Sequence, residues 1–158
     1  MRVMLTRWRG RVVMAALLVM LQIPTSAHAA GPGALTGGVI YDPSLTPASM
    51  TRDVSYAFGI TGVETRVGPM SLDCHLDGSS AGDLVSDGAS AVGTCVDVLL
   101  GWPASCTAFV QRVGAIGILQ MSCMTPWGPL LITGGLQFVP LTAPSAGSFA
   151  ITGFVGSQ

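Results

Sequence analysis

His75 and the acidic side chains are the first residues to weigh as chemical groups. The chain has a second histidine, His28, but it lies in a segment that we expect to be removed. A lone histidine beside a cysteine in a strand is usually a surface residue, and the cysteine spacings contain no C-x-x-C pair of the kind that binds zinc. We therefore predict a protein that is not an enzyme and holds no cofactor. A secreted hydrolase using His75 is the alternative.

Carboxylates cluster in the middle of the chain. Two of them precede a glycine, and loops of this kind can hold Ca²⁺ through oxygen ligands. The spacing matches no EF-hand or repeated calcium motif, and Asp-Gly is also good turn chemistry, so solvated turns are the favoured interpretation. The weak calcium candidates are Asp73, Asp77, Asp83 and Asp87, with Asp97 nearby in sequence.

Aromatic side chains offer one possible ligand platform. Trp102 and Trp127 each adjoin a proline at a predicted strand end, where a tryptophan more often covers the end of a β-sandwich. Together with Tyr41 and Tyr56 they could instead stack on sugar rings. This is the main sequence-based argument for ligand binding.

The four cysteines and the strands around them predict most of the fold. If Gly114-Ala115 is a two-residue hairpin loop, Cys106 lies opposite Cys123 in a non-hydrogen-bonded pair, close enough for a disulfide. Strand alternation then places the cysteines with Ala108, Val110, Gly117, Leu119 and Met121 on one face, which we predict to be core. Four cysteines allow three connectivities, and we favour Cys74–Cys95 with Cys106–Cys123.

The rest of the chain consists of short alternating segments separated by Gly and Pro. Apolar residues alternate over 54–60 and 70–76, and we predict a first strand at 39–41 ended by Asp42-Pro43. The stretch 77–90 is predicted to be loop-rich, with a strand over 92–102 that contains Cys95. No helical periodicity is sustained, so the expected fold is an antiparallel β-sandwich or small barrel of about seven to nine strands.

The N-terminus predicts export. Four arginines precede an apolar run at 12–23 and the triplet Ala27-His28-Ala29, which together are typical of a secretory signal peptide covering 1–29, with cleavage after Ala29 or Ala30. The run is too short for a transmembrane helix. The remainder, 30–158, is one domain with a flexible lead-in at 30–38. Oxidation persists outside the cytosol, which favours disulfides over a metal site for the cysteines.

Charge restricts the partners. All eight acidic residues lie in the predicted mature part, against three scattered arginines, Arg52, Arg66 and Arg112, so a nucleic acid is not expected. From residue 113 to the end there is no charged side chain. This half either has a neutral Gly/Ser/Thr surface or contacts an apolar envelope or another subunit, because uncharged strands lack the charges that normally block association.

The mature chain resembles small secreted actinobacterial β-proteins of unknown function. The resemblance rests on LTGGVIYDPSL at 35–45, DCHLDGSS at 73–80, GTC at 93–95 and the cysteine-closed hairpin at 106–123. It implies export, a β-fold and disulfides, and it brings no activity. We expect a secreted or envelope-associated binding or structural module with a carbohydrate, protein or lipid partner. Besides the hydrolase, a second alternative to this module is a self-associating surface subunit that uses residues 113–158.

Overall fold

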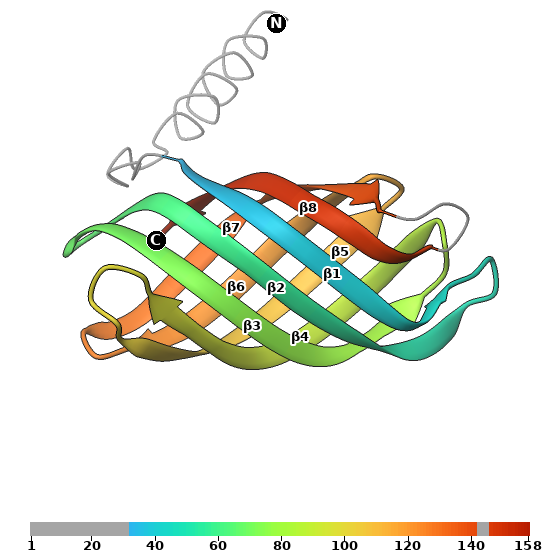
Figure 1. Cartoon of the computed structure of the whole chain (residues 1–158), viewed down its shortest axis with the longest axis horizontal. Coiled ribbons are helices and arrows are strands. Elements are labelled where there is room, and N and C mark those ends of the chain that lie inside the picture. Colours follow the sequence, from blue (N-terminus) through green and yellow to red (C-terminus); the bar gives the residue numbers. More distant parts are fainter. Residues whose placement is uncertain (1–31, 142–145) are drawn as a thin grey trace, which may run out of the picture.

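A single antiparallel sheet closes on itself into an eight-stranded barrel (Figure 1). The computed structural model describes residues 32–141 and 146–158, so the predicted signal peptide at 1–29 lies outside the described residues. Each strand pairs with its neighbours in sequence, and β1 also pairs with β8. The strands are β1 (Gly33–Leu45), β2 (Met50–Thr65), β3 (Gly68–Gly82), β4 (Ser86–Asp97), β5 (Pro103–Val113), β6 (Ile116–Thr125), β7 (Gly128–Pro140) and β8 (Ala146–Ser157).

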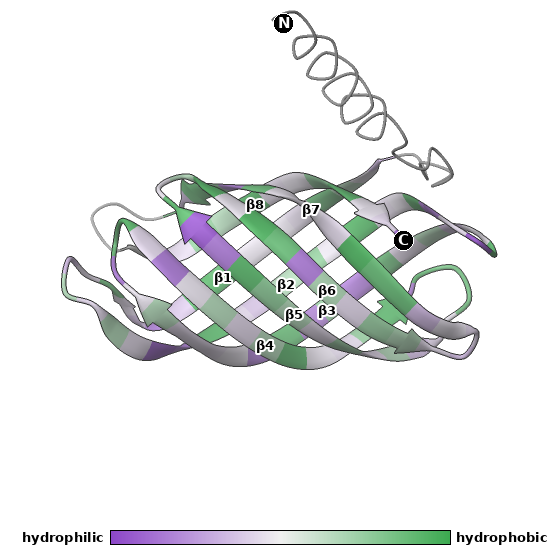
Figure 2. Ribbon diagram, turned by 180° about the vertical axis from the view of Figure 1, so that it is seen from behind, coloured by the Kyte–Doolittle hydropathy of each residue, from purple (hydrophilic) through white to green (hydrophobic). Residues whose placement is uncertain are grey.

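The all-β prediction is confirmed, and of the two expected forms the structure has the barrel and not the sandwich. Closure leaves no free sheet edge, and eight strands enclose a space that side chains can just fill. The interior is packed with aliphatic and aromatic side chains, among which Ile60, Ile132 and Phe138 are almost fully buried. Hydropathy changes repeatedly along each strand in Figure 2, because successive side chains point to opposite faces. None of the described residues belongs to a helix that is long and apolar enough to cross a membrane.

The β5–β6 hairpin has the predicted register. Val113 pairs with Ile116, and the pairing continues outward to Cys106 opposite Cys123. Gly114 has a φ of 61°, the left-handed value that glycine adopts at little cost in a two-residue turn. The predicted core face points inward, and the opposite face, which includes Phe109 and Ile118, is exposed.

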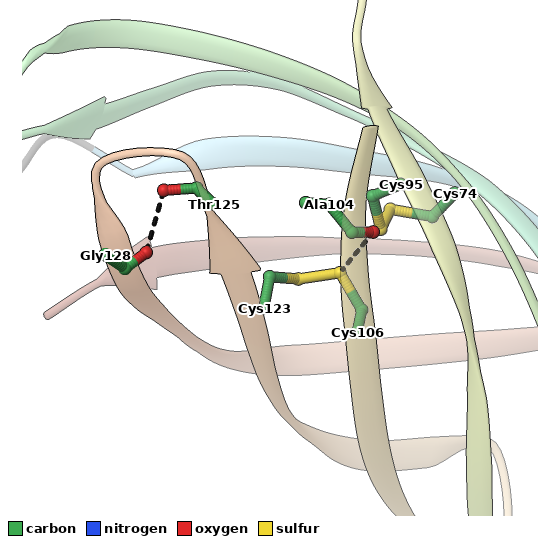
Figure 3. The surroundings of a disulfide bond; sticks show 7 residues. All are labelled: Cys74, Cys95, Ala104, Cys106, Cys123, Thr125 and Gly128. Atoms are coloured by element: carbon green, nitrogen blue, oxygen red, sulfur yellow. Dashed lines mark hydrogen bonds between the residues drawn. A yellow bond between two sulfur atoms is a disulfide. The ribbon is translucent and has the colours of Figure 1, made fainter. Parts of the chain in front are cut away.

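Both predicted disulfides are present and lie near one end of the barrel interior (Figure 3). Cys74 is opposite Cys95 in the β3–β4 pairing, with a Cα–Cα distance of 4.0 Å, and the corresponding distance for Cys106 and Cys123 is 4.1 Å. The Sγ atoms of Cys95, Cys106 and Cys123 lie within 4.8 Å of one another, so the two bonds are neighbours. We call this the disulfide end; it carries the β2–β3, β4–β5 and β6–β7 turns, on the left in Figure 1.

The predicted start of the barrel is wrong. From Gly33 onward, the predicted flexible lead-in at 30–38 and the strand predicted to end at Asp42-Pro43 are replaced by one strand that runs to Leu45, and residues 30–31 lie outside the described residues. Leu35 already points into the core, and small residues between it and Val39 allow pairing with both β2 and β8. The strand continues past Pro43. The irregularity around the proline is taken up by a shift of the β1–β8 register between Ile40 and Leu45.

The predicted loop at 77–90 is also wrong, since β3 continues to Gly82 and β4 begins at Ser86. Glycine and serine, typical turn residues, are used here for close packing: a Cβ at Gly78 would overlap the Ser90 carbonyl oxygen. The strand predicted to end at Trp102 ends at Asp97. Its carboxylate accepts hydrogen bonds from the backbone N–H groups of Leu99 and Leu100 and forms the turn instead.

Loss of the Cys106–Cys123 disulfide should lower stability without changing the fold. The bond joins residues separated by 17 positions, and closing a loop of this size restricts the unfolded chain by about 3 kcal/mol. We expect the Cys106→Ser/Cys123→Ser pair to lose about this much unfolding free energy in urea. The Cys74→Ser/Cys95→Ser pair, with a separation of 21, is the matched comparison and should lose a similar amount. An unchanged urea midpoint in either variant would contradict the prediction.

Candidate functional site

Polar side chains gather inside the barrel at the end opposite the disulfides. We call this the polar end; it carries the β1–β2, β3–β4 and β5–β6 turns, on the right in Figure 1. Strand alternation points its charged and hydroxyl groups inward, because they share parity with core residues such as Val54 and Val110. The buried polar residues of this end are Tyr41 on β1, Arg52 and Tyr56 on β2, Ser80 on β3, Asp87 on β4 and Arg112 on β5.

Arg112 binds two turns together from inside the barrel. Its Nε donates to Asp87 Oδ1 at 2.5 Å, and both side chains are almost completely buried. Nη1 donates to the carbonyl oxygens of Leu84 and Gly114 at 3.1 and 2.9 Å, and Nη2 donates to that of Asp83 at 2.9 Å. The guanidinium is thus paired on all three nitrogens, and losing Asp87 would leave a buried charge, which typically costs 3–5 kcal/mol.

Aromatic rings pack beside this ion pair. The Arg112 guanidinium carbon lies 5.8 Å from the centroid of the Phe149 ring, within cation–π range. Tyr41 meets the same ring edge-on at a centroid distance of 5.8 Å, and Phe138 meets it at 6.3 Å. Phe149 therefore separates the polar groups from the apolar interior.

The two tyrosine hydroxyls are buried and lie against each other, and that of Tyr41 also lies against Asp87, but neither makes a hydrogen bond of ordinary geometry to a described residue. Burial, reinforced by the Asp87 carboxylate, raises the pKa of Tyr41 above its ordinary value. Burial also raises the pKa of Tyr56, with Tyr41 and Asp87 as the next causes. Both hydroxyls stay protonated at neutral pH and can donate a hydrogen bond.

Arg52 is the second buried arginine, and its bonding is incomplete. Nη1 donates to the Gly82 carbonyl oxygen at 3.2 Å, while Nε and Nη2 have no partner among the described residues. Ser80 is directly opposite Arg52 in the β2–β3 pairing, and its Oγ is also buried and without a partner there. An unsatisfied buried polar group costs about 1–3 kcal/mol, and more for a charged one, so most such groups bind something.

The polar end therefore offers donors and a positive charge. This end holds two buried arginines and one buried carboxylate, Asp87, which is paired with Arg112. At the rim, the carboxylate of Asp83 accepts from the backbone N–H groups of Ser86 and Val85, which lowers the pKa of Asp83. All five unpartnered atoms can donate a hydrogen bond. This arrangement suits recognition of an acceptor more than catalysis.

The sequence-based candidates missed this site, although strand parity could have found it. Arg52 has the parity of Val54, and Arg112 has the parity of the cysteine face, so alternation alone places both side chains inward. Asp87, interpreted as part of a solvated turn, is instead buried with Arg112. Tyr41 and Tyr56 are interior residues and do not join the tryptophans in a surface platform.

His75 lies on the exposed outer face of β3. Its neighbours across the sheet are Ala57 on β2 and Thr94 on β4. A G-x-S-x-G pattern, typical of a hydrolase nucleophile elbow, does occur at residues 78–82 and is missing from the sequence-based candidates. It forms the continuous end of β3 rather than a strand-to-helix turn, and Ser80 points inward, away from the face that carries His75.

The calcium candidates are not brought together. Asp73 and Asp77 lie on the outer face of β3, where Asp77 accepts a 2.6 Å hydrogen bond from Ser55. Asp83 lies in the β3–β4 turn, and Asp87 points into the barrel. In the described ranges the one group of three metal-ligating residues is formed by cysteines already in disulfides.

Trp102 and Trp127 do meet, at the disulfide end. Their ring centroids are 3.1 Å apart with a tilt of 36°, and Trp127 is about half exposed. The two rings come from the β4–β5 and β6–β7 turns and cover each other's faces. A flat double platform for a sugar is therefore not formed, and the exposed side of Trp127 remains.

Comparison with protein-family models, with curated proteins and with solved structures finds no match for this chain.

Buried tyrosines should be visible in an alkaline titration, because Tyr41 and Tyr56 are the only tyrosines of the chain. Since the folded-state pKa of each is raised above the unfolded value of about 10, the stability they contribute is complete below pH 10 and falls as the pH rises beyond it. We expect no phenolate absorbance at 295 nm at pH 10 to 11 in the folded protein, and normal titration in guanidinium. Phenolate formation near pH 10 with an unchanged circular dichroism spectrum would contradict the interior placement.

Proposed function

We propose that this chain is an exported, non-enzymatic binding protein of the cell envelope or extracellular medium, and that its binding site is the polar end of the barrel. The observation that carries the proposal is the set of buried donors, on Tyr41, Arg52, Tyr56 and Ser80, that have no hydrogen-bond partner within residues 32–141 and 146–158. A folded protein rarely leaves so many polar atoms of one region unpaired. A bound ligand with acceptor groups would pair them.

Two further features support this function over catalysis. The two disulfides are compatible with an oxidising compartment outside the cytosol. Around His75 the cross-strand neighbours are an alanine and a threonine, and Asp73 and Asp77 flank it along the outer face of β3, so the hydrolase alternative lacks a serine directly opposite its proposed base. The resemblance to small secreted actinobacterial β-proteins agrees with export and adds no substrate.

Ligand capture should depend on the inward serine and not on its outward neighbour. The protein, purified after export, is mixed with the small-molecule fraction of envelope or medium and examined by native mass spectrometry. We expect a one-to-one adduct that Ser80→Val weakens about tenfold, the equivalent of one hydrogen bond to a charged group.

The matched control is Ser79→Val, which changes the exposed neighbour on the same strand and should keep the adduct. Equal retention by both variants would move the site away from the polar end. No adduct from any fraction would reject the binding function.

A second candidate is self-association through the uncharged half of the barrel, with a second copy of the chain as the partner. On the outer face, Gly135 lies between Ile118 on β6 and Phe154 on β8, so these two exposed side chains flank a position without a side chain. Val113 and Ile116 continue the apolar surface at the β5–β6 turn. No charged side chain of residues 113–158 opposes contact between two such faces.

Self-association is tested by sedimentation over a range of concentrations. We expect a dimer or larger species that Phe154→Asp converts to a monomer, because a buried unpaired carboxylate is costly at an interface. Val92→Asp, which places the same charge on the exposed face of β4, is the control and should leave the assembly intact. A monomer at every concentration would reject this candidate.

A further inference from the structure

Arg52 presents a complete bidentate edge inside the barrel. Its side chain is 3% exposed, and its one hydrogen bond to a described residue is from Nη1 to Gly82. The two nitrogens left without a partner, Nε and Nη2, carry the parallel N–H groups that bind two oxygens of one carboxylate or phosphate. These two parallel N–H groups therefore indicate the shape of the ligand as well as its charge.

Ser80 extends this edge from the neighbouring strand. It is paired with Arg52 across the β2–β3 ladder, both side chains point inward, and its Oγ is among the unpartnered buried atoms. Side chains on directly opposed residues lie about 4.5–5.5 Å apart at Cβ. The Ser80 hydroxyl therefore starts beside the Arg52 side chain, where we expect it to donate to the same ligand.

No carboxylate among the described residues is hydrogen-bonded to Arg52. Asp87 Oδ1 accepts from Arg112 Nε, and Asp83, in the β3–β4 turn, accepts at Oδ1 from the backbone N–H groups of Val85 and Ser86 and acts on Arg52 only as a nearby negative charge. The buried residues of the polar end thus hold two cations and one anion. A water molecule would satisfy hydrogen bonds without adding negative charge, whereas an anion does both.

We propose that the ligand of the polar end is an oxyanion, a carboxylate or phosphate group held by Nε and Nη2 of Arg52 and by the hydroxyl of Ser80. This inference rests on the proposed binding function and specifies the class of ligand. The fork of the guanidinium selects a group with two coplanar oxygens over a spherical halide. Replacing Arg52 by an uncharged residue should therefore remove the preference for an oxyanion over a neutral ligand.

The direct test observes the arginine Nε–H signals of the exported protein by ¹⁵N NMR. The barrel contains three arginines, Arg52, Arg66 and Arg112, so the spectrum is simple to assign from single variants. Sodium acetate, sodium phosphate and sodium chloride are added at matched ionic strength, with acetamide as the neutral isostere of acetate. We expect a saturable shift of the Arg52 signal with acetate or phosphate, and none with acetamide or chloride.

Thermal unfolding supplies the second readout. At a concentration ten times the dissociation constant, the effective oxyanion should raise the Tm of the wild-type protein by about 5 °C. Arg52→Met should abolish this rise, and Arg52→Lys, which keeps the charge and loses the bidentate edge, should keep less than about half of it. Arg66→Met removes an exposed arginine of the β2–β3 turn and should respond like the wild type.

Each outcome separates the ligand class from the binding function. A response to acetate alone assigns a carboxylate, and a response to phosphate alone assigns a phosphate. An equal response to chloride, or an unmoved Arg52 signal with all anions, overturns the oxyanion site. If Ser80→Val still weakens capture of a neutral compound, the binding function survives that result. If Arg52→Met fails to fold, the NMR titration of the wild-type protein still decides whether Arg52 binds an oxyanion.

Discussion

Closure of the sheet is the constraint on which this structure depends. Once β1 pairs with β8, every strand has two neighbours and every second side chain must enter the interior. The chain satisfies this with aliphatic residues over most of the barrel and with two disulfides at one end. At the other end the same parity forces Arg52, Asp87 and Arg112 inward, where each charge needs compensation.

The two ends of the interior consequently differ in how they are held. At the disulfide end, covalent bonds join β3 to β4 and β5 to β6 across non-polar surroundings. At the polar end, Arg112 joins the β3–β4 and β5–β6 turns through one carboxylate and three carbonyl groups. Arg112 therefore has a structural role that satisfies its bonding, whereas two nitrogens of Arg52 have no partner in the described part of the chain. The contrast between two arginines in one environment is what singles out Arg52 as a binding group.

The sequence predicted those parts of the fold that depend on local pattern. The register from Gly114 out to Cys106 and Cys123 follows from turn chemistry and alternation, and it holds residue by residue. The extension of β3 and β4 through 77–90 could not be read in this way, because Gly78 and Ser80 have turn propensities and are kept in strands by pairing on both sides. Barrel closure itself depends on β1 meeting β8, a contact between the two ends of the domain that no local window contains.

The candidate site was within reach of the same alternation and was missed because residue type was given more weight than parity. An arginine is normally a surface residue, and Arg52 and Arg112 entered the sequence-based expectations only as scattered positive charges. Parity with Val54 and Val110 assigns them to the core, and the structure agrees with parity. A charged residue on the inward phase of a strand is expensive, so its persistence there demands a partner. Arg112 finds that partner in Asp87, and the logic that explains Arg112 requires an acceptor for Arg52.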